Sequence, residues 1–223
     1  MNGVDFEWAS LRDALPSLLG GLKLTIVNSV SCIVVSVLLG YLLATLLYFR
    51  PPILWRIAAF WVKFIRNTPL LIQIYFFYFG LPEIGIRPSA SVSGIIVLSL
   101  WAGAYQAENL RGAIEGLPRR LIEAGRSLGL HPLLLFSAII VPVATRTVVP
   151  AMMNTAVSTT KNTALLSAIG VPDLTYVAMD NIASTYRTLE NFLALLVGYL
   201  GIVLVMAAVA RLVEWRLGRG YRA

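Results

Sequence analysis

The sequence has little charge, one cysteine and one histidine. Only 13% of its 223 residues are charged, whereas soluble globular domains carry about 25%. The single cysteine, Cys32, excludes an intrachain disulfide framework, and the lone His131 has no second His or nearby Cys with which to hold a metal. The sequence also lacks a Walker-type phosphate loop, a Ser-His-Asp set and a carboxylate pair suited to hydrolysis. We therefore expect no catalytic residues, no metal site and no ATP hydrolysis by this chain.

Apolar residues are what the sequence has in excess. They make up 58% of the chain, and the mean hydropathy is +0.78. Soluble domains are about 45–50% apolar, so an all-α integral membrane protein with several spans is expected. The N-terminal residues include Asp5, Glu7 and Asp13 where a secretory signal would need basic residues. We expect the chain to be inserted by its own mature spans.

Five apolar stretches approach the length of about 20 residues that crosses the hydrocarbon core. We expect about five transmembrane helices in a single transmembrane domain covering residues 1–223, with spans at about 20–48, 66–81, 92–113, 146–169 and 189–213. Residues 53–64 mix Trp and apolar residues with Arg56 and Lys63, which is typical of an amphipathic segment in the membrane interface. Residues 114–141 are too charged to cross and predict two short helices. Residues 170–187 read as a loop.

The distribution of basic residues fixes the expected orientation. Five spans place the two termini on opposite sides. With the N-terminus outside, 13 of the 18 Lys and Arg residues fall on the inner side, as the positive-inside rule requires. The sequence thus predicts an N-terminus outside, a C-terminus in the cytoplasm and a cytoplasmic segment at 114–141. The net charge of +7 is accounted for by these loops, with no nucleic-acid partner.

The segment 114–141 contains a compact pattern of small residues. Glu123, Ala124 and Gly125 are followed by Arg126, and Gly129 stands six positions after the glutamate. Small side chains allow another protein's backbone to approach a short helix, and Gly129 can end that helix in a left-handed conformation. Glu123 offers an acceptor on the surface. The alternative is a solvated loop with an accidental Glu-Ala-Gly.

With Ile139, Val141 and Pro142 in register, this pattern resembles the "EAA" signature of bacterial ABC importer permeases. Gly125 replaces the second Ala of that signature, and Val141 replaces its Leu. Four further stretches resemble the polar amino acid permease family, which serves histidine, arginine, glutamine and glutamate. They are Arg66-Asn67-Thr68-Pro69-Leu70-Leu71, Ala104-Tyr105-Gln106-Ala107-Glu108-Asn109-Leu110-Arg111-Gly112, Lys161-Asn162-Thr163-Ala164-Leu165 and Pro172-Asp173-Leu174.

The resemblance implies a type I ABC importer permease fold in the bacterial inner membrane. It implies a second permease subunit, as a homodimer or heterodimer, and an extracytoplasmic amino-acid-binding protein. It also implies two cytoplasmic ATPases, which bind the ATP and Mg and couple their hydrolysis to alternating access, so this chain needs no cofactor of its own. Residues Glu123, Ala124, Gly125, Arg126 and Gly129 would contact the ATPase. The implied substrate is a polar amino acid, or alternatively a derivative such as an opine.

Polar residues inside the spans are expensive and usually face the protein interior. Glu108 and Arg111 are three residues apart on one helix, so a structural ion pair is the preferred interpretation over a role in transport. On the fourth span, Asn154, Ser158 and Lys161 fall on one stripe with Thr155 beside it. We expect this stripe to line a substrate pathway, and the alternative is polar contact between helices.

Thr155 stands where relatives that take basic amino acids commonly have Glu. A carboxylate is the natural partner of a cationic side chain, so Thr155 argues against Arg, Lys or His as the substrate. Two rival functions remain open. An ion-coupled secondary carrier usually shows inverted repeats, which are not found in this sequence, and a structural scaffold would not need the polar stripe.

Overall fold

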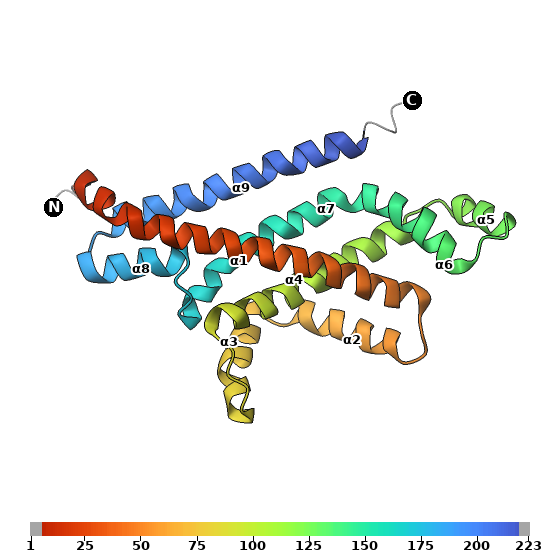
Figure 1. The fold of residues 1–223 in the computed structure, drawn as a ribbon, viewed down its shortest axis with the longest axis horizontal. Helices are drawn as coiled ribbons and strands as arrows, with labels where there is room; N and C mark the ends of the chain where they lie inside the picture. The colour runs from red at the N-terminus through yellow and green to blue at the C-terminus, as the bar shows by residue number, and fades with distance from the viewer. Residues whose placement is uncertain (1–5, 219–223) are drawn as a thin grey trace. The chain divides into compact units, whose positions relative to one another are not determined.

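The computed structural model describes residues 6–218, and this part of the chain consists of helices joined by short turns, with no strand (Figure 1). Four helical segments are long and apolar enough to cross a membrane, judged by length and composition. They are α1 (Trp8–Phe49), α4 (Ala90–Glu115), the continuous stretch Pro132–Ile169, and α9 (Thr188–Gly218). The fold class expected from composition is thereby confirmed as all-α.

The stretch Pro132–Ile169 changes its hydrogen-bonding pattern along its length without a break. It begins as α6 (Pro132–Leu135), passes through a π-turn, η2 (Phe136–Ile140), and continues as α7 (Val141–Asn162). It ends as a 3-10 segment, η3 (Thr163–Ile169), which stops at Gly170. Helical structure therefore reaches back from the predicted fourth span into the segment 114–141.

Shorter helices lie between the long ones. They are α2 (Leu54–Asn67), α3 (Leu70–Gly80), the 3-10 turn η1 (Leu81–Ile84), α5 (Arg119–Ser127) and α8 (Leu174–Thr185). The break between α2 and α3 falls at Thr68-Pro69, where Thr68 is extended with a ψ of 143°, because a residue before proline is disfavoured in the helical region. Helix α3, at 11 residues, is shorter than a full crossing needs, so the fifth span stays a prediction.

One predicted loop is a helix in the structure, and the first predicted span lies within a longer helix. Residues 170–187 do not form a loop, because α8 occupies most of them. Asp173 caps this helix by accepting a hydrogen bond from the Tyr176 N–H at 2.9 Å. The first helix begins at Trp8, well before the predicted span at 20–48, and it continues through Pro16. The charged residues Arg12 and Asp13 lie in this early extension.

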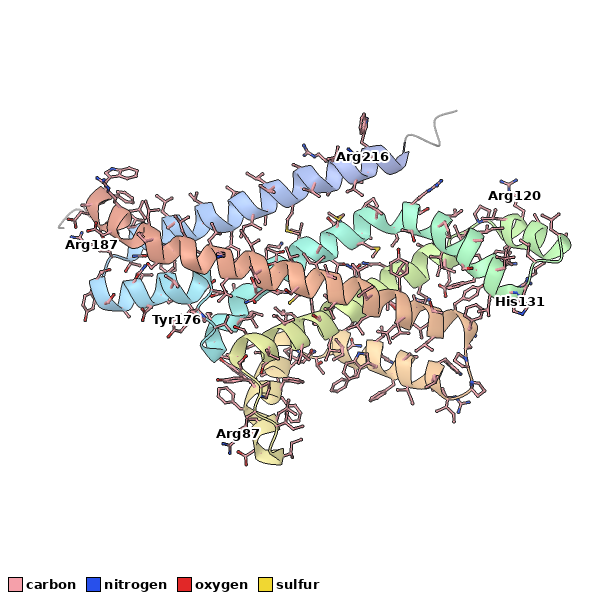
Figure 2. All side chains as sticks on the ribbon, viewed as in Figure 1. Arg87, Arg120, His131, Tyr176, Arg187 and Arg216 are labelled. Carbon is pink, nitrogen blue, oxygen red and sulfur yellow. The ribbon has the colours of Figure 1, made fainter. Side chains whose placement is uncertain are left out.

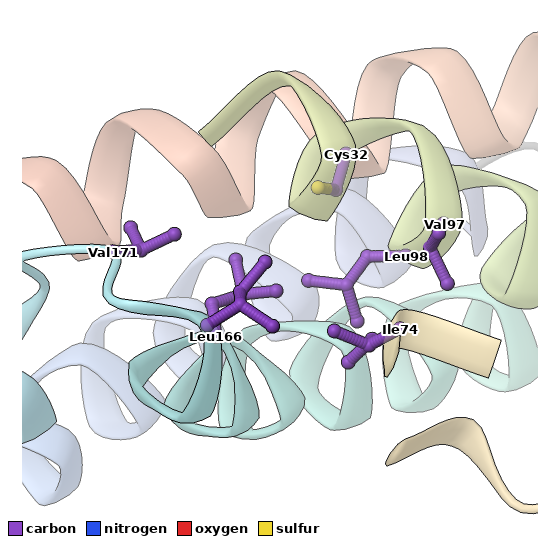
Figure 3. Close-up of a cluster of buried hydrophobic side chains, with 7 residues drawn as sticks. Cys32, Ile74, Val97, Leu98, Leu166 and Val171 are labelled. Atoms are coloured by element: carbon purple, nitrogen blue, oxygen red, sulfur yellow. The ribbon is translucent and has the colours of Figure 1, made fainter. Parts of the chain in front are cut away.

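The described chain divides into two compact units, whose boundaries fall within α1, α4, α7 and α9 and at the break between α2 and α3. Within the described residues, the first unit contains residues 6–34, 69–99 and 157–207. Its main core joins α1, α3, α4 and η3 through side chains that are less than a tenth exposed (Figure 3). They are Cys32, Ile74, Val97, Leu98, Leu166, Ile169 and Val171. A second cluster packs α8 on α1 and α9 around Leu174.

Within the described residues, the second unit contains residues 35–68, 100–156 and 208–218. Its clusters pack α2 on α4, α4 on α7, and the short helices α5 and α6 under the end of α1. In the last of these, the Phe136 ring stacks on Tyr48 with a centroid separation of 4.7 Å. The α5–α6 segment is thus anchored to the end of α1 by aromatic packing rather than left as a free loop.

Candidate functional site

The segment from α5 to α6 holds the residues predicted to couple the chain to a partner. Helix α5 packs against the protein on the face that carries Gly125, which is buried. Glu123, Ala124 and Arg126 are exposed. Leu128, one turn after Ala124, is 79% exposed. Figure 2 shows Arg120 and His131 on the outer part of this segment. The outward surface of α5 therefore combines charge with exposed apolar area.

Gly129 ends α5 in the left-handed conformation that the sequence predicts, with φ at +72°. Its N–H donates to the Arg126 carbonyl at 2.9 Å, and the Leu130 N–H donates to the Gly125 carbonyl at 3.2 Å. This pair of bonds is a Schellman motif, which satisfies carbonyls that the helix end would otherwise leave open. His131 then caps α6 by accepting from the Leu133 N–H at 3.4 Å. The turn between the two helices is fixed at both ends.

Gly125 has a different role from the one its sequence context suggests. The sequence predicts that its small size admits another protein's backbone. In the structure, a Cβ at this position would lie 2.4 Å from Leu135 Cδ1. Gly125 is therefore small because α6 packs against it, and Ala124 is the small residue that remains accessible on the outer side.

Glu108 and Arg111 form an ion pair on α4, and it belongs to a larger network. Glu108 also binds Arg66 of α2 at 3.0 Å, and Arg111 binds Glu115 at 2.6 Å. The Arg66 guanidinium carbon lies 5.3 Å from the centroid of the Tyr105 ring. The sequence spacing reveals the pairs within α4, but not Arg66, which is 42 residues from Glu108. The network joins α2 to α4.

The predicted pathway residues on α7 differ in their exposure. Asn154 and Lys161 are exposed, and Ser158 is half-buried. Thr155 is 8% exposed, and its hydroxyl accepts a hydrogen bond from Asn109 Nδ2 at 2.9 Å. It donates in turn to the Ala151 carbonyl at 3.2 Å. Thr155 thus packs on α4, whereas the other three residues, Asn154, Ser158 and Lys161, lie on a different face of α7 from Thr155.

The polar contact between α4 and α7 extends beyond Thr155. Gln106, which is 1% exposed, donates through Nε2 to the Met152 carbonyl at 3.2 Å. Asn109 and Gln106 are three residues apart and face α7 together. The sequence does not reveal that these two residues bind α7. Polar residues on an apolar helix show which face is polar, but not which neighbouring helix supplies their hydrogen-bond partners.

Asp173 is a buried acid on the segment between η3 and α8. It is fully buried, and Oδ1 accepts from the Tyr176 N–H. Burial raises the pKa of this carboxyl from its ordinary 3.8 to about 6, against the opposing effect of the backbone hydrogen bonds. Its position at the start of a helix favours the charged form, but burial is the larger effect.

Comparison with known proteins gives the family. Residues 36–219 match the model described as "Binding-protein-dependent transport system inner membrane component". The chain is 34% identical to the "Probable amino-acid ABC transporter permease protein PatM" of Vibrio harveyi, over 98% of this chain and 99% of the relative. It is 32% identical to the "Glutamine transport system permease protein GlnP" of Escherichia coli, over 96% and 99% respectively.

The fold also matches a solved structure. The chain is similar to one in the "Crystal structure of an amino acid ABC transporter with histidines", with a TM-score of 0.87 and 28% identity, covering 95% of this chain and 99% of that one. The family model, the two relatives and the solved structure each match most or nearly all of this chain. This chain belongs to the family of inner-membrane components of binding-protein-dependent transport systems.

Proposed function

We propose that this chain is the translocation subunit of an ATP-driven importer of polar amino acids, and that α5 docks on a cytoplasmic ATPase. The observation that carries the proposal is the outward surface of α5. Glu123, Ala124 and Leu128 are exposed together on α5 and its C-terminal end, which backbone hydrogen bonds of Gly129 and Leu130 hold in place. Such a rigid, mixed surface suits a partner's groove, because little conformational entropy is lost on binding.

The proposed mechanism is a two-state change driven by the ATPases. ATP and Mg bind to the partner and not to this chain. Nucleotide binding closes the ATPases, and this closure favours one of two arrangements of the permease pair. Because α5 is packed on α6 through Gly125 and Leu135, movement of the ATPase is passed to α6 and then to α7. The second permease copy would be this chain or a sister subunit.

The proposed orientation places the N-terminus outside and α5 in the cytoplasm, with about five crossings. The excess of Lys and Arg on the segments next to α2, α5 and the end of α9 supports this orientation. The fifth crossing would be the segment containing α3, which is shorter than the other four. An extracytoplasmic binding protein would then deliver substrate from the outer side of the membrane.

The proposed substrate class is polar amino acids without a cationic side chain. Two observations support it. The relatives quoted above are named for amino acids or for glutamine, and α7 carries no Asp or Glu that could pair with a cationic side chain. We propose Asn154, Ser158 and Lys161 as pathway residues on α7. Thr155 supports the helix from behind through Asn109.

The test is coupling in the reconstituted complex of permease, ATPase and binding protein. Glu123→Lys reverses a charge on the docking surface, and Gly129→Leu puts a side chain where φ is +72°. Both variants should lose binding-protein-stimulated ATP hydrolysis. They should also lose uptake of those members of a panel of glutamine, glutamate, arginine and octopine that the unmodified complex takes up. Matched controls are Glu83→Lys, which is also exposed, and Gly85→Leu, whose φ is +85°. Full coupled uptake in both test variants would reject α5 as the docking element.

A further inference from the structure

A cavity of about 350 Å³ lies in the second unit between the end of α1, α2 and α4. Its charged lining is predominantly basic. The cations are Arg50, Lys63, Arg66 and Arg111, and the carboxylates are Glu108 and Glu115. The cavity is formed within one compact unit, so its lining depends only on contacts inside that unit.

The carboxylates in this cavity are already paired. Glu108 binds both Arg66 and Arg111, and Glu115 binds Arg111. Within residues 6–218, neither Arg50 nor Lys63 has a carboxylate partner. The Arg50 guanidinium instead lies over the Trp55 ring, 5.9 Å from its centroid. Two positive charges therefore remain at one cavity, and together they favour an anionic ligand.

Helix α2 shows what kind of anion reaches this cavity. Its inner face packs Ala58, Val62 and Ile65 into the protein. A second face carries Ile57, Phe60 and Phe64, at spacings of three and four, and these side chains are 59%, 70% and 49% exposed. Its basic residues occupy the remaining face, beside the cavity. An exposed apolar stripe next to a basic face is the pattern of a helix that lies in the membrane interface.

We propose that this cavity binds the phosphate of an anionic phospholipid, with the acyl chains lying along Ile57, Phe60 and Phe64. Arg50 and Lys63 would supply the free positive charge, and Arg66 and Arg111 are held in place by Glu108. The proposal rests on the orientation proposed above, in which this end of α1 and α2 faces the cytoplasmic leaflet. Anionic lipids are attracted to basic cavities between helices on that side.

The site is tested with the assembled importer in nanodiscs of phosphatidylcholine containing acyl-brominated phosphatidylglycerol. Bromine quenches nearby tryptophan, and Trp55 lines the cavity. The part of the total quenching that is lost in Trp55→Phe comes from Trp55 and therefore reports lipid at this cavity. We expect it to be stronger with brominated phosphatidylglycerol than with brominated phosphatidylcholine. Arg50→Gln combined with Lys63→Gln should weaken phosphatidylglycerol binding about thirty-fold, because each basic residue near an anionic surface contributes about five-fold.

Arg211→Gln is the matched control, since it removes an exposed basic charge of α9 outside the cavity lining. It should retain most of the Trp55 quenching. If the double variant does not assemble, Lys63→Gln alone should weaken binding about five-fold. Equal quenching by both brominated lipids, no Trp55 quenching at all, or displacement of the lipid by inorganic phosphate would each overturn the proposal. The quenching measurement needs no substrate, so it is independent of transport. If lipid quenching is absent while amino acid uptake is normal, the lipid site is rejected and the proposed function stands. If lipid quenching is present while uptake is absent, the proposed transport function is rejected and the lipid site stands.

Discussion

The contact between Gly125 and Leu135 can be tested by a double-mutant cycle. An alanine Cβ at position 125 would lie 2.4 Å from Leu135 Cδ1, whereas non-bonded carbons pack at about 3.5–4.0 Å. Leu135 is 3% exposed and has little room to retreat. Gly125→Ala should therefore destabilise the contact between α5 and α6 by about 1–3 kcal/mol, the usual cost of overpacking.

Removing the opposing side chain should relieve this clash. Leu135→Ala alone should cost about 2–5 kcal/mol because it opens a cavity. In the double variant the new methyl group has space and fills part of that cavity. The two changes together should then cost about 1–3 kcal/mol less than the sum of the single changes.

Hydrogen exchange of the α5 amides measures the local opening free energy directly. Gly125→Ala should reduce their protection about ten-fold or more, and the double variant should be no less protected than Leu135→Ala. Gly112→Ala is the control, because a Cβ there meets no atom within 4 Å. If Gly125→Ala leaves the protection of α5 unchanged, or if the single effects simply add, the packing argument is refuted.

Three further predictions concern other parts of the chain. Because the pKa of Asp173 rises from 3.8 to about 6 on folding, the folded protein holds a proton that the unfolded chain releases, and stability should fall as pH rises through that window by up to about 3 kcal/mol. Asp173→Asn should remove this dependence and raise the melting temperature at neutral pH; a wild-type pH profile in the variant would contradict it. Thr155→Val should cost about 1 kcal/mol in thermal stability by depriving Asn109 of an acceptor, while Thr155→Ser should be neutral, and equal melting temperatures would argue against the contact. In a background without the native cysteine, Arg87→Cys should react with an impermeant reagent from outside and Arg120→Cys should not; the opposite pattern would reverse the proposed orientation.

Most of the fold was predictable because long apolar runs and amphipathic spacing are local signals. The amphipathic segment before Pro69 is helix α2, and the longest apolar runs lie in α1 and α9. Helix α8 was missed because Pro172 and nearby charges suggested a loop. Asp173 followed by apolar residues was an available sign of a helix start.

The site was predictable only where its geometry is local. The left-handed conformation of Gly129 follows from its place after a short helix, and the pairing of Glu108 with Arg111 follows from helical spacing. The contacts of Arg66 with Glu108 and of Asn109 with Thr155 join helices far apart in sequence. Which helix faces a given polar side chain is decided by packing, and sequence spacing does not contain that information.

The π-turn at Phe136–Ile140 has a mechanical consequence. Helix α6 passes through it into α7 with no intervening loop, so α6 and α7 form one continuous helical segment. A displacement of the α5–α6 end is therefore passed to the first part of α7, before Pro150, except for what the wider π-turn absorbs. Deleting one residue there would convert the π-turn to ordinary α-helix and rotate α6 about the helix axis relative to α7. The length of this turn thus sets the angle at which motion is delivered along α7.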